Sequence, residues 1–214
     1  MNLLIDTMIA LLILTNLRLI ASSRLAACIH AVTLQGILLG ILPLLVGTGG
    51  LALRPCILSG IAILLKGIIF PRLLLLALRA SGARRELKPF VSYSTSLLFG
   101  VVLLAAAMWF GRRLPLPIHA ASRLVVPMAM FTVLIGMFVI VSRRQALTQV
   151  LAYLVMENGI YAFGLAFALQ EPLLVELGVL LDAFMAVFVM GITIFHINRE
   201  LDHMDTDQLS VLKD

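Results

Sequence analysis

Charged residues are scarce in this sequence, and so are cysteines and aromatic side chains. Only 13% of the 214 residues are charged and 7% are aromatic, whereas 62% are hydrophobic. A water-soluble globule has about half apolar residues, so this class of protein is excluded. The two cysteines, Cys28 and Cys56, lack the number and spacing for a disulfide framework, an iron–sulfur cluster or a nickel site.

Long apolar runs take up most of the chain. A helix that crosses a bilayer needs about 20 mainly apolar residues. Windows of that length predict seven transmembrane helices, at residues 2–20, 25–47, 55–78, 91–110, 120–141, 146–169 and 173–196. The fold class is therefore all-α, a polytopic membrane helical bundle. We divide it into an N-terminal four-helix region (1–118), a three-helix region (119–198) and a polar tail (199–214).

The basic residues predict how the bundle is oriented. The net charge of +5 does not indicate nucleic-acid binding, because most basic residues fall in short loops between apolar runs, where they set topology. Eleven of them belong to one end of an odd-numbered bundle and four to the other, namely Arg54, Arg112, Arg113 and Arg123. Positive loops stay inside, so we expect the N-terminus outside and the C-terminus in the cytoplasm.

Three ionisable residues lie near the middle of their apolar runs: Lys66, Glu157 and Asp182. A charge at the bilayer centre costs roughly 2.5 to 3.5 kcal/mol on insertion scales, so such residues indicate an ion or proton path by default. At about 1.5 Å per residue, Glu157 lies roughly 16 Å and Asp182 roughly 21 Å from the helix end. Lys66 also lies near the midplane. We expect these three side chains to form a proton relay.

Further polar residues share helices with these acids. Gln149, Tyr153 and Tyr161 recur every four residues around Glu157, which draws a polar stripe along one helix. Thr193 and His196 lie within about 40° of Asp182 on the next helix, at 100° per residue. Two plainer interpretations stay open. Lys66 could do no more than hold an acid in a buried ion pair, and the stripe could be ordinary interhelical hydrogen bonding.

Two local features predict how helices meet near Lys66. Gly36 and Gly40 form a GxxxG pair, which permits close packing of a second helix. Pro71 has no backbone N–H, so it frees the carbonyl of Gly67, directly after Lys66.

Several motifs resemble a known family. SRRQ at 142–145, LVMENG at 154–159, EPLLVELG at 171–178, LLDAFMAVFVM at 180–190 and the final LSVLKD resemble hydrogenase-4 component E. The last three predicted helices are also similar to the small K-type subunit of respiratory complex I and of cation/proton antiporters. Arg143, Arg144, Asn158 and Asp182 match that subunit's pattern. Its membrane glutamate, however, would fall at Leu154, one turn before Glu157.

The resemblance implies a non-catalytic membrane subunit of an energy-converting nickel–iron hydrogenase in a prokaryotic plasma (inner) membrane. Redox chemistry would then drive protons or sodium across the membrane, with Asn158 supporting the relay. No catalytic residue, metal or cofactor is expected in this chain; the NiFe centre and iron–sulfur clusters would belong to partner subunits. Expected partners are antiporter-like membrane subunits, a hydrogenase peripheral arm and membrane lipid. The alternatives are a cation/proton antiporter subunit and a non-transporting anchor for a redox arm.

Overall fold

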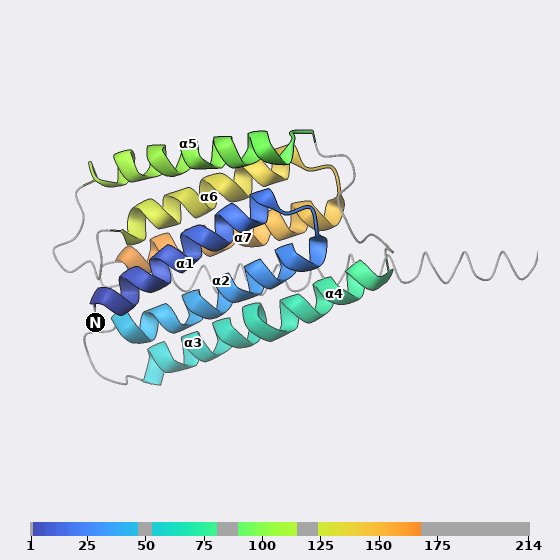
Figure 1. Cartoon of the computed structure of the whole chain (residues 1–214). Helices are drawn as coiled ribbons and strands as arrows, with labels where there is room; N and C mark the ends of the chain where they lie inside the picture. Colours follow the sequence, from blue (N-terminus) through green and yellow to red (C-terminus); the bar gives the residue numbers. More distant parts are fainter. Residues whose placement is uncertain (1, 47–52, 81–89, 115–123, 168–214) are drawn as a thin grey trace, which may run out of the picture.

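Six helical segments lie side by side in one bundle (Figure 1) in this computed structural model, which describes residues 2–46, 53–80, 90–114 and 124–167. The third of these segments consists of α3, η1 and α4, which follow one another without a break; η1 is a π-helix. The elements are α1 (Asn2–Ala21), α2 (Leu25–Val46), α3 (Leu53–Leu64), η1 (Leu65–Ile69), α4 (Phe70–Ala80), α5 (Tyr93–Gly111), α6 (Val125–Ser142) and α7 (Ala146–Phe167).

The all-helical prediction is confirmed, and these segments follow the first six predicted spans closely. The largest shift is at α6, which begins at Val125 rather than at residue 120. The seventh predicted span (173–196), with Asp182, Thr193 and His196, lies outside the described residues, as does the tail at 199–214. The division at residues 118 and 119 stays a prediction.

Five of the described helices are long and apolar enough to cross a membrane, with mean hydropathies from 1.8 to 2.4. They are α1, α2, Ser59–Arg79 in the third segment, α5 and α6. α7, which carries Glu157 and Asn158, is not one of the five. The chain is therefore a membrane protein.

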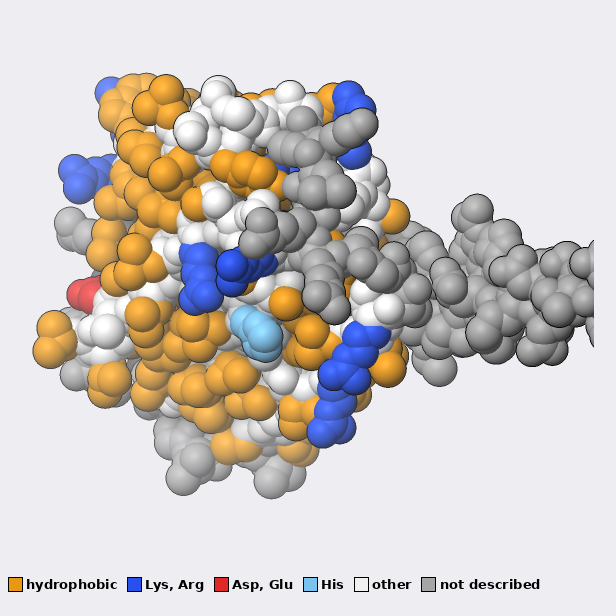
Figure 2. Space-filling model, turned by 45° about the vertical axis from the view of Figure 1, so that its right-hand side comes forward, with side chains coloured by type: hydrophobic (Ala, Val, Ile, Leu, Met, Phe, Trp, Pro, Cys, Tyr) orange, Lys and Arg blue, Asp and Glu red, His pale blue; other side chains and the backbone are white. Residues whose placement is uncertain are grey.

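The surface has the distribution of side chains that a bilayer requires. Hydrophobic side chains cover most of the visible face (Figure 2), and Arg79, Arg112, Arg113 and Arg144 lie at or next to helix ends. α5 is the helix most open to lipid, with exposed Leu98, Val102 and Trp109. The Arg113 guanidinium lies 4.1 Å from the Trp109 ring centroid, an arrangement suited to the membrane–water interface.

Glycines set the closest helix contacts. A Cβ at Gly136 of α6 would meet the backbone of Met156, and one at Gly159 of α7 would meet Val133. α6 and α7 therefore pack backbone to backbone through these residues. On α2, a Cβ at Gly36 would meet Lys66 and one at Gly40 would meet Ile63. The predicted role of the GxxxG pair in close packing is confirmed, and its partner is the third helical segment.

Candidate functional site

Lys66 lies in the one-turn π-helix η1, in the middle of the third helical segment. The backbone N–H of Phe70 donates to the carbonyl of Leu65, five residues earlier. A π-turn widens the helix just before Pro71, whose ring would otherwise press on the carbonyl four residues back. Single π-turns inside α-helices are frequent at functional sites. The sequence predicted a local disturbance here from Pro71, but not its π geometry.

The Lys66 ammonium forms an ion pair with Glu157. Nζ lies 3.1 Å from Oε1, and the two side chains are only 4% and 1% exposed. Gly36 lets the lysine stem cross α2 at close range, so that its amine reaches α7. Neither carboxylate oxygen accepts an aligned hydrogen bond from the described residues. The attraction of the lysine is therefore the main force that stabilises the buried negative charge.

Two neighbours complete the surroundings of Lys66. Nζ donates a hydrogen bond of 3.0 Å to Oδ1 of Asn158, the residue after Glu157. It also lies 5.1 Å from the ring centroid of Tyr161, one turn further along α7, within the range of a cation–π interaction. Three α7 residues that the sequence singled out thus surround one lysine. The structure brings Lys66, Glu157, Asn158 and Tyr161 together.

A chain of buried hydrogen bonds runs from this pair across the bundle. Asn158 donates to Gln35 of α2 at 3.5 Å, and Gln35 donates to Asn16 of α1 at 2.8 Å. Asn16 then donates to the hydroxyl of Thr132 on α6, also at 2.8 Å. Gln35, Asn16 and Thr132 are each 3% exposed or less. Together with Lys66, these hydrogen-bonded side chains link five of the helical segments.

The groups at the two ends of this hydrogen-bond chain fix the same donor-to-acceptor direction along it. Lys66 has only donors, so Asn158 must turn its carbonyl oxygen toward the ammonium. At the far end Thr132 gives its hydroxyl proton to the carbonyl of Met128 at 2.8 Å, so its oxygen accepts from Asn16. Every amide dipole between these ends is aligned. Aligned hydrogen bonds polarise one another, which stabilises the charge on Lys66.

The predicted stripe on α7 is not one continuous path in the structure. Tyr161 is buried beside Lys66, but Tyr153 is half-buried and packs against the apolar core. Exposed Gln149 donates a hydrogen bond of 3.2 Å to the carbonyl of Arg143, in the turn between α6 and α7. Gln149 thus stabilises the turn before its own helix and Tyr153 packs against apolar side chains, so neither makes the interhelical hydrogen bond of the plainer interpretation.

Leu154 occupies the position where the K-type glutamate was expected. It is 3% exposed and lines a small cavity together with Lys66 and Asn158. Positions 154 and 158 are one helical turn apart and therefore face the same way. An acid at either 154 or 157 would lie close to Lys66.

The turn that carries Arg143 and Arg144 contacts residues at or near the ends of neighbouring helices. Arg143 is 2% exposed, donates a hydrogen bond of 2.9 Å to the carbonyl of Ile20 and lies 4.4 Å from the Tyr93 ring centroid. It thereby satisfies a carbonyl in the last turn of α1, where a positive charge is favourable. Arg144 is exposed and lies 4.1 Å from the ring centroid of Phe90. These contacts give the motif a role in assembling the bundle.

Gln35, Asn16 and Thr132 were missed by the sequence reasoning. The available signal was a strongly polar residue deep inside the first and second apolar runs, where each unpaired group would carry a penalty. The sequence signal was weaker for Thr132, because a threonine in a membrane helix often forms a hydrogen bond with its own helix backbone. Among the described residues, no three histidine, cysteine, aspartate or glutamate side chains stand close enough to hold a metal ion.

Comparisons with known proteins agree with this architecture. Residues 124–214 match the family NADH-ubiquinone/plastoquinone oxidoreductase chain 4L. The chain is 32% identical to uncharacterized protein Rv0085 of Mycobacterium tuberculosis over 215 aligned positions, which cover all of this chain and 97% of that protein. Hydrogenase-4 component E of Escherichia coli K12 is 35% identical over 113 residues, 53% of this chain and 51% of that protein; the Shigella flexneri protein gives the same values. No solved structure matches.

The fold and the site define a class: a polytopic helical membrane protein with a lysine–glutamate pair buried among its helices. Its C-terminal region is of the chain 4L type found in complex I. The chain belongs to one family with Rv0085, and about half of it is homologous to hydrogenase-4 component E.

Proposed function

We propose that this chain is a membrane subunit of a hydrogenase-4-type complex and that its Lys66–Glu157 pair carries charge during redox-driven proton or sodium translocation. The family comparisons support the coarser statement, a membrane subunit of a respiratory-like complex. The single observation that carries the finer proposal is the buried ion pair at 3.1 Å.

A buried pair is a weak way to stabilise a fold, because desolvating both charges offsets most of their attraction. The same property makes it useful as a switch. When a neighbouring charge changes, the ammonium can follow it, and the carboxylate left behind takes up a proton because its charge is no longer compensated. The π-turn that carries Lys66 supports such movement, since its hydrogen bonds differ from those of the flanking helix.

Glu157 has hydrogen-bonding capacity that the described residues do not use. Its Oε2 and the Tyr161 hydroxyl, one turn away, have no hydrogen-bond partner among the described residues. We propose that Asp182 supplies the next acid of the path, with Thr193 and His196 leading from it. The aligned amides of Asn158 and Gln35 hold Lys66 in position; amides do not readily pass protons onward.

The proposal extends to partners and orientation. Antiporter-like membrane subunits and a hydrogenase peripheral arm would bind this chain, and the partner subunits would hold the NiFe centre and the iron–sulfur clusters. The end with Arg79 and Arg144 would face the cytoplasm of a prokaryotic inner membrane, because it carries the larger share of basic residues. The N-terminus, at the other end of α1, would lie outside.

A native purification tests the assembly. The chain would be tagged in its own membranes, purified in mild detergent, and analysed by mass spectrometry and for nickel and iron. Antiporter-like subunits together with a nickel-containing module would support the proposal. Ion exchange by the reconstituted complex without any electron donor would instead identify an antiporter. Recovery of a redox arm alone, with no ion movement during turnover, would leave a non-transporting anchor.

A further inference from the structure

Arg72 stands on the outer face of α4. The third helical segment has only α2 and, through α4, α7 as neighbours among the described helices, and it lies along one edge of the bundle that they form (Figure 1). Arg72, Leu76 and Arg79 follow one another at intervals of four and three residues, and all three are exposed. At this spacing they share one side of the helix. This side is called the Arg72 face below.

The helix position of Arg72 lies inside the hydrocarbon region of a bilayer. Lys66 crosses α2 at Gly36, which is near the middle of the apolar span Leu25–Leu45. Arg72 is six residues further along its own segment, which places it about 9 Å from that level. Half of a hydrocarbon core is about 15 Å thick, so Arg72 lies about 6 Å inside the border. Arg79, seven residues further on, lies outside it.

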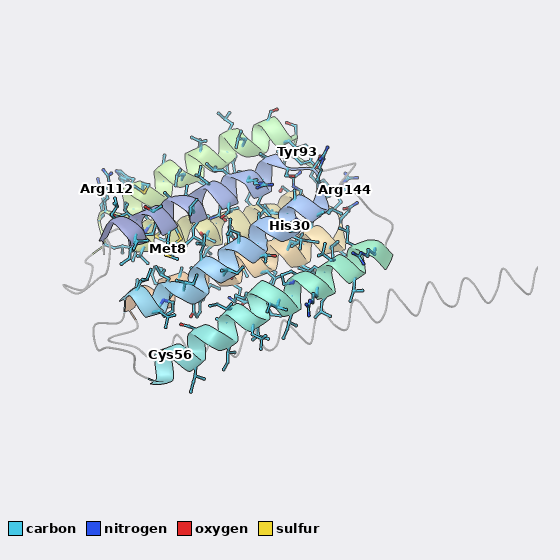
Figure 3. The ribbon with its side chains drawn as sticks, turned by 60° about the horizontal axis from the view of Figure 1, so that its bottom comes forward. Met8, His30, Cys56, Tyr93, Arg112 and Arg144 are labelled. Atoms are coloured by element: carbon cyan, nitrogen blue, oxygen red, sulfur yellow. The ribbon has the colours of Figure 1, made fainter. Side chains whose placement is uncertain are left out.

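The direction of α4 makes a lipid headgroup a poor partner for Arg72. The Cα–Cβ bonds of an α-helix tilt toward its N-terminus. The third segment begins at the end of the bundle opposite Arg144, where Cys56 is labelled (Figure 3). The Arg72 side chain therefore starts toward the membrane centre and would have to turn back to reach a phosphate at the Arg79 end. Charged side chains at such depth typically pair with one another.

No acid of this chain is expected at the level of Arg72. The described residues contain two acids: Asp6 lies near the start of α1, at the other end of the bundle, and Glu157 is already paired in the interior. In the seventh predicted span Asp182 lies roughly 21 Å from the cytoplasmic end, on the far side of the membrane centre. Residues 183–199 contain no acid. A carboxylate for Arg72 must therefore come from another chain.

We propose that the Arg72 face is the docking surface for a transmembrane helix of a partner membrane subunit, and that this helix presents a carboxylate to Arg72 inside the membrane. The inference rests on the proposed function, which supplies such a partner. Charge complementarity selects the partner helix, and exposed Leu76 packs against its apolar side chains. The contact also brings a partner's charge to about 9 Å from Lys66 along the helix axis.

Photocrosslinking of the full chain in its native membranes identifies what covers this face and leaves Arg72 in place. A benzophenone amino acid would replace Leu76, one turn from Arg72. We expect it to join to an apolar peptide of another membrane subunit that contains an aspartate or glutamate. Products with lipid alone, with residues 173–196 of this chain, or with a partner peptide that has no acid would overturn the inference.

The amount of partner subunit that co-purifies with the tagged chain supplies the second readout. Arg72→Glu should reduce this amount several-fold, and exchange of the crosslinked partner acid for lysine should restore it. Arg79→Glu is the matched control, because Arg79 shares the face but lies outside the hydrocarbon region, and it should equal the wild type.

Unchanged co-purification in Arg72→Glu, or no restoration by the charge exchange, would overturn the inference alone as long as the wild-type chain still binds its membrane subunits. Purification of the wild-type chain without any membrane subunit would overturn the proposed function as well.

Discussion

Lys66 reaches Glu157 across the flat face that Gly36 gives to α2, and the two charges meet at 3.1 Å in the interior of the bundle. A longer side chain at position 36 would stand between α2 and the third helical segment, where Lys66 lies. The ion pair therefore depends on a residue that contributes no chemistry of its own.

Removing one charge of the pair should destabilise the protein more than removing both. Glu157→Gln leaves an uncompensated buried ammonium, which typically costs about 3 to 5 kcal/mol. The double variant Lys66→Met, Glu157→Leu replaces the pair by apolar groups of similar size and should lie closer to the wild type. Thermal unfolding in detergent of both single variants and the double variant measures the coupling; additive effects would contradict a direct pair.

Gly36→Ala should lower stability and weaken the contact between α2 and the third segment, because its new Cβ would overlap the Lys66 Cβ. Gly60→Ala is the control, since a Cβ there meets nothing within 4 Å and alanine favours a helix by roughly 0.5 to 1 kcal/mol. Melting temperatures of the two variants should shift in opposite directions. Equal shifts would show that position 36 is not tightly packed.

Thr132→Val should remove the acceptor at the far end of the amide chain and leave Asn16 without its partner on α6. Hydrogen bonds between membrane helices contribute on the order of 0.6 kcal/mol, with a maximum near 1.7. We expect a loss in this range, and none from Thr132→Ser, which keeps the hydroxyl. Chemical unfolding of the two variants measures this loss. An unchanged free energy of unfolding in Thr132→Val would mean that the hydrogen-bond chain adds no stability.

Moving the carboxylate by one turn should preserve the pairing with Lys66. Leu154 lines the same cavity as Lys66 and Asn158, so Glu157→Gln combined with Leu154→Glu places an acid beside the same ammonium. We expect this double variant to recover part of the ion transport that Glu157→Gln loses. No recovery, in a complex that assembles normally, would show that position 157 itself is required.

Much of this arrangement could be predicted from the sequence, because membrane helices have a strong signal in their length and hydropathy. The same logic identified Lys66 and Glu157, since a charge in an apolar run is rare. A buried ion pair of Lys66 with an acid was among the expectations, but the hydrogen-bond partners of Asn158 could not be predicted. Periodicity gives the face of a helix but not the neighbour that it meets, so Gln35 and Asn16 became visible only once α1, α2 and α7 were placed together.

Ion movement per electron in inverted membrane vesicles tests the central claim most directly. Wild-type complex and Glu157→Gln would be compared at equal rates of donor oxidation, with Asp6→Asn, at the end of α1, as the matched change of carboxylate to amide. We predict that Glu157→Gln assembles but moves several-fold fewer ions per electron, while Asp6→Asn equals the wild type. An unchanged ratio in an assembled Glu157→Gln complex would contradict charge transfer through the Lys66–Glu157 pair.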